Sequence, residues 1–183
     1  MSGRVLSKIS FRESEFLENF KITTLEKGTP NEYKKVKLYN TKARILLTIP
    51  TNTSSFIQLF GYYKADGAPR GSARCALFAL LNKLLKLGEI KMERNVHVEH
   101  PTPSDQNLPR LIKLYKEIGF AENKPTPGNP TNLDATVGQL LEALGRQCKM
   151  IVNDKEAASK QEQMSKVPKK MKKKRMYRPK LRL

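Results

Sequence analysis

The sequence contains no tryptophan, only two cysteines and no long apolar run. Cys75 and Cys148 are too few for a disulfide framework or a cysteine-rich zinc site, so a reducing, intracellular compartment is the simplest interpretation. No apolar run approaches the ~18 residues needed to cross a bilayer, and residues 1–11 lack the apolar stretch of a signal peptide. These absences predict a soluble protein without a membrane span.

Acidic residues are also scarce, because 17 Asp and Glu stand against 35 Lys and Arg, for a net charge of +18. The excess is concentrated in residues 160–183, which contain 11 basic residues and one acid, Glu162. A chain of 183 residues can bury the core of one domain. We therefore predict one globular domain over residues 1–153 and a lysine- and arginine-rich tail over residues 154–183.

The tail has the composition of an arm that binds nucleic acid or another polyanion. Its contacts with phosphates would release counterions, so binding should weaken steeply with salt, and Tyr177 could add a stacking contact. Residues 169–175 also resemble a nuclear import signal, and a virion or nucleoprotein particle is a second expected location. The alternative is a merely solubilising terminus. The predicted nucleic-acid-binding residues are Lys169, Lys170, Lys172, Lys173, Lys174, Arg175, Arg178, Lys180 and Arg182.

The first half of the domain has the pattern of a β-meander. Strands are predicted over residues 20–25, 33–39, 43–49 and 55–64, which are rich in β-branched and aromatic residues or alternate in polarity. Turn-forming residues separate the last three of these segments. Short connections of this kind favour antiparallel neighbours.

The second half has apolar residues at helical spacing. A further strand is predicted over residues 91–99, because Val96 and Val98 alternate with polar residues, and residues 121–130 have loop composition. This order predicts an α/β (α+β) fold, with a mixed, mostly antiparallel twisted sheet flanked by helices and followed by the irregular basic tail. The predicted helices cover residues 13–20, 73–87, 108–118 and 134–150.

Residues 69–88 combine a loop of small residues with the start of a helix. Such a junction presents several unpaired backbone amides and the positive end of the helix, which together can bind a phosphate. Small side chains matter because larger ones would keep the phosphate from the amides. An ordinary turn before a helix is the alternative interpretation.

Residues 107–120 carry the most specific pattern, an Asn followed by a helix that ends in Leu114-Tyr115 and Gly119-Phe120. This string resembles the last signature motif of the GNAT N-acyltransferase superfamily, in which an Asn after a strand precedes a helix ending in Leu-Tyr-x-x-x-Gly-Phe. The alternative is an ordinary amphipathic helix with a glycine cap.

The phosphate loop of that family has the pattern Arg/Gln-x-x-Gly-x-Gly/Ala, one helix and one strand before this motif. Two registers fit here. In the preferred one, residues 70–75 match, with Ala73 and Cys75 in place of the usual glycines. In the other, Gly71 and Ala73 match but Ala68 replaces the Arg or Gln. The resemblance covers residues 55–120 and leaves the tail out.

The resemblance implies acetyl-coenzyme A, bound where the strands at residues 56–64 and 91–99 separate. Backbone amides of residues 70–74 would hold the pyrophosphate, and the side chains of Arg70 and Arg74 would add positive charge. The phenol of Tyr115 would protonate the departing thiolate. An amine would attack the thioester directly, without a covalent enzyme intermediate. The cofactor-binding residues implied are Tyr62, Tyr63, Arg70, Gly71, Ser72, Ala73, Arg74, Cys75 and Asn107.

A general base is less evident, because the strand at residues 55–64 has no carboxylate. On the next strand His97 is the best candidate by its ordinary pKa, ahead of Glu93 and Glu99. The alternative is that these residues line the wetter face of the strand. Their spacing fits no known metal-ligand set, so no metal is expected. Cys75 is interpreted as a small filler residue rather than a nucleophile.

The sequence therefore supports an acetyl-CoA-dependent N-acetyltransferase whose basic tail localises it. One alternative is a catalytically inactive GNAT-fold structural component of a capsid or nucleoprotein assembly, which would bind polyanions through the tail. The other is a simple nucleic-acid-binding protein with an accidental fold similarity. The expected partners are nucleic acid or another polyanion, and a large protein assembly.

Overall fold

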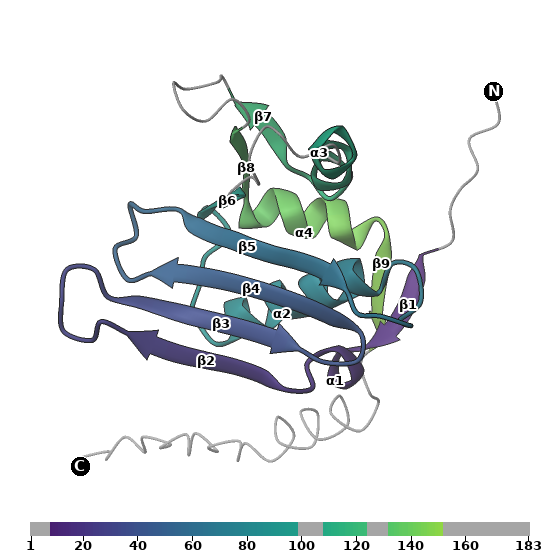
Figure 1. Cartoon of the computed structure of the whole chain (residues 1–183), viewed down its shortest axis with the longest axis horizontal. Helices are drawn as coiled ribbons and strands as arrows, with labels where there is room; N and C mark the ends of the chain where they lie inside the picture. Colours follow the sequence, from purple (N-terminus) through teal and green to yellow (C-terminus); the bar gives the residue numbers. More distant parts are fainter. Residues whose placement is uncertain (1–7, 99–107, 124–131, 152–183) are drawn as a thin grey trace, which may run out of the picture. The chain divides into compact units, whose positions relative to one another are not determined.

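The computed structural model describes residues 8–98, 108–123 and 132–151 (Figure 1). These residues all lie within one compact unit of the chain. The helices are α1 (Glu13–Phe16), α2 (Ser72–Lys86), α3 (Leu108–Glu117) and α4 (Val137–Gly145). The strands are β1 (Ile9–Arg12), β2 (Phe20–Leu25), β3 (Tyr33–Tyr39), β4 (Ala43–Pro50), β5 (Ile57–Lys64), β6 (Asn95–Val98), β7 (Ala121–Asn123), β8 (Asn132–Thr136) and β9 (Cys148–Ile151).

Seven strands form one sheet in the order β2-β3-β4-β5-β6-β8-β7. β5 and β6 are parallel, and the other neighbouring pairs of this sheet are antiparallel. β2 to β5 are consecutive both along the chain and in the sheet, which confirms the predicted meander. The predicted fold class, a mixed α+β fold with a mostly antiparallel sheet flanked by helices, is also confirmed.

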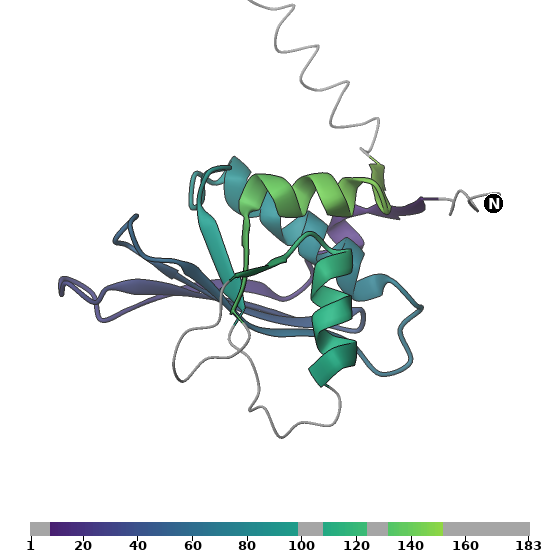
Figure 2. The same cartoon turned by 90° about the horizontal axis from the view of Figure 1, so that it is seen from above.

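The strands of the meander bury one face and leave the other in contact with solvent. On β4, Ala43, Ile45, Leu47 and Ile49 are buried, and the residues between them are more exposed. This alternation follows from the two-residue period of a strand. Helices α2 and α4 cover the buried face, as the view along the sheet in Figure 2 makes clear.

Helix α2 supplies most of the cover for the meander. Its buried residues include Leu77, Leu80, Leu81 and Leu84, which recur at helical spacing and pack in the same core as the strands. The helix ends at Lys86, one residue before its predicted end, and Gly88 follows with φ +72 and an amide that donates to the carbonyl of Leu85. A glycine in this conformation is a common helix end.

The predicted helix over residues 134–150 is wrong at both ends. Residues 132–136 form β8 instead, with Leu133 and Ala135 buried against the sheet. Helix α4 begins only after Thr136, whose hydroxyl accepts a hydrogen bond from the amide of Gln139, and the Gln139 side chain accepts one from the amide of Thr136 in return. This reciprocal capping box fixes the start of the helix.

A two-stranded parallel sheet joins the two ends of the described chain. β1 pairs with β9 in a register that sets Ile9 opposite Cys148 and Arg12 opposite Ile151. Neither strand was predicted, and most of β9 falls in the helix predicted over residues 134–150. The short helix near residue 13 is also one turn rather than two, because α1 ends at Phe16.

Several predicted features lie outside the described residues, namely the basic tail with its nucleic-acid-binding residues, Asn107 and Glu99. The strand predicted over residues 91–99 begins only at Asn95. The loop predicted over residues 121–130 begins with β7, which pairs with β8. In the parts of the chain that the structure describes, no helix is long and apolar enough to span a membrane.

Candidate active site where the parallel strands part

The two parallel strands of the sheet stay together over a short stretch. Residues Ile57 to Leu59 of β5 face Val96 to Val98 of β6. Beyond this point β6 ends, whereas β5 continues to Lys64. The second half of β5, up to Lys64, therefore has no β6 partner among the described residues.

A β-bulge marks the place where the strands part. Leu46 on β4 faces Gly61, and the next residue, Leu47, faces Leu59, which leaves Phe60 as the extra residue on β5. A bulge bends its strand and increases the local twist. The bend turns the second half of β5 away from the direction of its first half.

The start of α2 presents backbone amides that no side chain caps. Gly71 is the residue before the helix and has φ +89, a left-handed conformation that favours glycine. The amide and the hydroxyl of Ser72 both donate to the carbonyl of Pro69, at 3.2 and 2.7 Å. The next amides, of Ala73 and Arg74, receive no side-chain cap, so they are the backbone donors that the predicted anion site would use.

Neighbouring side chains restrict access to this helix start. A Cβ placed on Gly71 would lie 2.4 Å from Cδ1 of Ile9, so the β1 side chain occupies the space above the glycine. Ser72 and Ala73 are buried, whereas Arg70 is exposed. An approaching phosphate would meet Arg70 first and would have to displace Ile9, which is itself 40% exposed.

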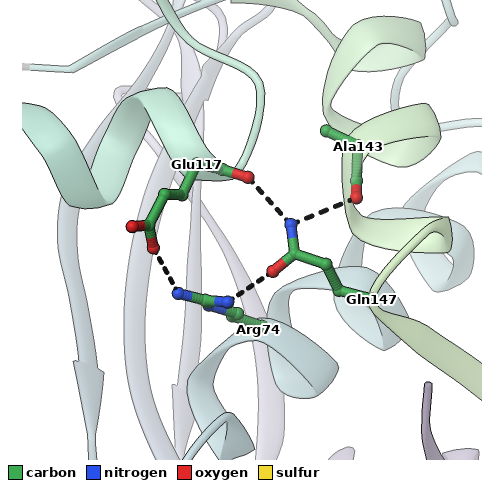
Figure 3. Close-up of polar contacts among 4 residues, drawn as sticks. All are labelled: Arg74, Glu117, Ala143 and Gln147. Atoms are coloured by element: carbon green, nitrogen blue, oxygen red, sulfur yellow. Dashed lines mark hydrogen bonds and ion pairs between the residues drawn. The ribbon is translucent and has the colours of Figure 1, made fainter. Parts of the chain in front are cut away.

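Arg74 is engaged within the protein rather than directed at the helix start (Figure 3). Its guanidinium forms an ion pair with Glu117 at 2.6 Å and donates to the Oε1 atom of Gln147 at 2.5 Å. The amide group of Gln147 in turn donates to the carbonyls of Glu117 and Ala143. This network joins α2, α3 and the turn after α4, so the phosphate contact expected of the Arg74 side chain would require the ion pair to open.

The predicted acid, Tyr115, lies in a cluster of aromatic rings. Its ring centroid is 6.1 Å from that of Tyr62 and 5.6 Å from that of Phe120. The side chain is 7% exposed, and burial, with a smaller contribution from nearby Tyr63, raises its pKa to about 12. Burial likewise raises the pKa of Tyr62. The Tyr115 phenol therefore keeps its proton at neutral pH and acts as a hydrogen-bond donor rather than a base.

The predicted base, His97, is paired with a carboxylate that the sequence analysis did not identify. Its Nδ1 atom lies 2.5 Å from Oδ1 of Asp134, the residue opposite it on β8. Gln58 faces it on β5, and the ring of Phe56 is 6.0 Å from the imidazole. A carboxylate at Nδ1 fixes the orientation of the ring and leaves Nε2 as its second functional atom.

The structure does not bring the two predicted catalytic residues into contact. Gln58, which faces His97, and Tyr62, which touches Tyr115, are four positions apart on β5, a separation of roughly 13 Å at the usual rise of a strand. The imidazole also lies on the less buried side of β6, opposite Val96 and Val98. The point at which β5 and β6 part lies between the two positions.

Cys75 is buried in the first turn of α2, and its surroundings do not favour the reactive thiolate form. Its Sγ atom lies 3.1 Å from Sγ of Cys148 on β9. The hydrogen bond to Cys148 and burial raise the pKa of the Cys75 thiol, which keeps it protonated. This environment agrees with the interpretation of Cys75 as a small filler residue.

Of the remaining predicted residues, Tyr63 is 60% exposed on the open side of β5. Among the described residues, no group of three or more His, Cys, Asp or Glu side chains could hold a metal ion.

Asp134 was missed because its segment was assigned to a helix; the alternation of Leu133 and Ala135 was the signal of a strand. No family model matches the chain, and no curated protein matches it.

Proposed function

We propose that the domain is an acetyl-CoA-dependent N-acetyltransferase of the GNAT type, which transfers an acetyl group to an amine by direct attack. The observation that carries this proposal is the uncapped start of α2 downstream of β5, whose second half has no described β6 partner and lies beside Tyr115. Strand ends and helix starts that meet in this way are usual sites for ligands with phosphate groups.

The pyrophosphate of the cofactor would bind at the start of α2, with the Ile9 side chain displaced from above Gly71. The amides of Ala73 and Arg74 would hold its oxygens, and the exposed Arg70 would add a positive charge. The residues from Tyr62 onward on β5 have no β6 partner among the described residues, so their backbone groups could bind the pantetheine arm. When bound, the cofactor would supply the acetyl thioester.

Tyr115 and His97 would donate and accept the protons of the reaction. On one side, the Tyr115 phenol holds a proton at neutral pH that it could donate to a leaving thiolate. On the other, His97 oriented by Asp134 could accept a proton from an amine that enters from the open face. In this proposal the amine would approach His97 from the open face, and the cofactor would approach from the start of α2.

Binding of acetyl-CoA to the full chain, measured by calorimetry, tests the proposal. We expect micromolar binding, which Arg70→Ala weakens by roughly tenfold, since a hydrogen bond to a charged group is lost. Arg146→Ala, another exposed arginine, is the matched control and should bind as the wild type does. An acetyl-transfer assay with a panel of amines would follow, in which Tyr115→Phe loses turnover but keeps binding. No binding at millimolar acetyl-CoA would contradict the proposal.

A second candidate is the inactive GNAT-type component of a nucleoprotein or capsid assembly. Three observations favour it: Ile9 lies over Gly71, Arg74 is already ion-paired, and the pKa of Tyr115 is about 12. A phenol at this pKa is ~3 to 4 units less acidic than an ordinary thiol, so full transfer of its proton would cost about 5 kcal/mol. Failure of acetyl-CoA to bind, with retention of polyanions, would select this candidate.

A further inference from the structure

The face of the meander opposite α2 and α4 is not covered by any described helix. Figure 1 looks onto this face, with β2, β3, β4 and β5 in front and α2 behind them. The central strands bury their other face, as the near-zero exposure of Val36 and Leu38 on β3 and of Ile45 and Leu47 on β4 shows. The open face is therefore the side on which the meander can meet a partner.

The open face is positively charged and contains no acid. The sequences of β2 to β5 include no Asp or Glu. Lys21, Lys35, Lys37 and Arg44 alternate with the buried residues and so point to the open side. None of the four forms an ion pair with a described residue, unlike Lys34 on the other side, which pairs with Glu89.

Two of these lysines directly oppose each other. Lys21 on β2 faces Lys37 on β3, and like charges at opposed positions destabilise a sheet. Farther along these strands Tyr39 faces Arg44 and Arg44 faces Tyr63, so this cation stands between two aromatic residues. The opposed lysines cost some stability in the isolated protein, and an anionic partner would relieve that cost.

Aromatic rings lie among the cations and are exposed to an unusual degree. Tyr39 is 51% exposed, Tyr63 60% and the bulge residue Phe60 40%. A Cβ on Gly61 would lie 3.3 Å from Cε2 of Tyr63, so this ring lies over the glycine, close to the sheet surface. Exposed rings held against a rigid sheet are suited to stacking rather than to hydrophobic packing.

We propose that the open face of β2 to β5 binds single-stranded nucleic acid. Lys21, Lys35, Lys37 and Arg44 would contact phosphates, and unpaired bases would stack on Tyr39 and Tyr63. A duplex would use the charges but not the rings, because its bases are already stacked. The proposal is independent of acyl transfer and adds a second, folded polyanion site to the one expected of the tail.

Fluorescence anisotropy of the full chain tests the proposal through the rings. The probes are labelled oligo-dT and oligo-U of roughly 12 nucleotides, a typical site size, and a DNA duplex of equal length. We expect Tyr39→Ala/Tyr63→Ala to weaken binding of the single strands by roughly tenfold or more and to leave the duplex unchanged. Tyr39→Phe/Tyr63→Phe keeps both rings and should restore binding. The two single strands distinguish DNA from RNA as the ligand.

The charges are tested by the salt dependence of the same measurement. Lys35→Gln/Lys37→Gln/Arg44→Gln should make the slope of log K against log salt shallower by about 2 for a single strand. Lys91→Gln/Lys113→Gln/Lys149→Gln removes as much charge from exposed positions off the open face and should leave the slope unchanged. Thermal melts of each variant check folding.

Three results would overturn the proposal. One is equal weakening of single-strand and duplex binding by the alanine variant, which would mean that the rings do not stack with bases. Another is an unchanged salt slope in the glutamine variant on the open face, which would place all phosphate contacts in the tail. The third is a dimer in sedimentation that the alanine variant dissociates, which would show that a second copy covers the face.

Discussion

The two faces of the meander use alternate residues of the same strands, yet they have opposite chemistry. On β3, Val36 and Leu38 are fully buried under α2, and Lys35 and Lys37 lie between them on the open side. One face is held by apolar burial, and the other keeps positive charges near one another without compensation. The comparison teaches that stability and recognition are separated across a single layer of backbone.

Near β5 and β6, the two sides of the sheet each carry one of the predicted catalytic residues. Tyr115 contacts Tyr62 of β5 on the covered side, and His97 of β6 lies on the open side, where it pairs with Asp134. Substitutions on the covered face should therefore lower the free energy of unfolding, whereas substitutions on the open face should alter the binding of nucleic acid. The following predictions test that division, from the largest expected effect to the smallest.

A cavity on the covered face should have the largest effect. Leu80 of α2 is 0% exposed, so Leu80→Ala should lower the free energy of unfolding by about 2 to 5 kcal/mol. Lys37→Ala on the open face is the matched surface change and should stay within about 0.5 kcal/mol of the wild type. Urea unfolding followed by circular dichroism measures both, and comparable losses in the two variants would break the comparison.

Alkaline pH should destabilise the covered face through Tyr115. Burial raises the pKa of this phenol in the folded protein to about 12, above its ordinary value of 10. Its contribution is therefore complete below pH 10 and is lost as the pH rises toward 12, by a total of about 3 kcal/mol. Tyr115→Phe should make the stability profile less steep over this range in urea titrations, and the loss that remains is expected from Tyr62, whose pKa is also raised by burial. An unchanged profile would mean that the phenol is not desolvated.

Gly119, from the Gly-Phe pair of the signature motif, should be harder to replace than another left-handed glycine. It has φ +109, and an added Cβ would lie 3.0 Å from the backbone oxygen of Gln139. Gly28 has φ +79 and open space around it. We expect Gly119→Ala to cost about 2 to 3 kcal/mol and Gly28→Ala about 1 kcal/mol, measured by thermal unfolding. Equal costs would show that the motif glycine is required for its φ angle alone.

The smallest effect is expected at the ion pair that links the helices. Arg74 and Glu117 have side chains that are 27% and 43% exposed, so solvent screens their attraction. A double-mutant cycle with Arg74→Gln and Glu117→Gln should give a coupling energy below about 1 kcal/mol, and less at high salt. A coupling of several kcal/mol would mean that this network contributes to stability as a buried one does.

Local patterns were sufficient to predict the meander and the helix that covers it. Alternation of polar and apolar residues predicts the strands at Phe20–Leu25 and Tyr33–Tyr39. A glycine, Gly88, marks the end of α2. These signals are carried by neighbouring residues, so no tertiary information was needed. The position of Tyr115 beside β5 also agrees with the order of elements.

The remainder depends on contacts between residues far apart in the sequence. β1 and β9 are short, and each is a strand only because the other pairs with it. Arg74 was expected to face a phosphate, but Glu117 and Gln147 come from later elements and bind its guanidinium. The start of α4 was the exception, because Thr136 and Gln139 have the spacing of a capping box and could have been recognised.

The pairing of β1 with β9 has a consequence for the order of assembly. Ile9 lies over Gly71 from a strand whose hydrogen-bonding partner begins at Cys148. During synthesis on the ribosome, Ile9 emerges early but cannot be anchored until almost the whole domain has followed it. The start of α2 is thus the last part of the domain to be closed, and a nascent chain halted before Cys148 would leave it accessible.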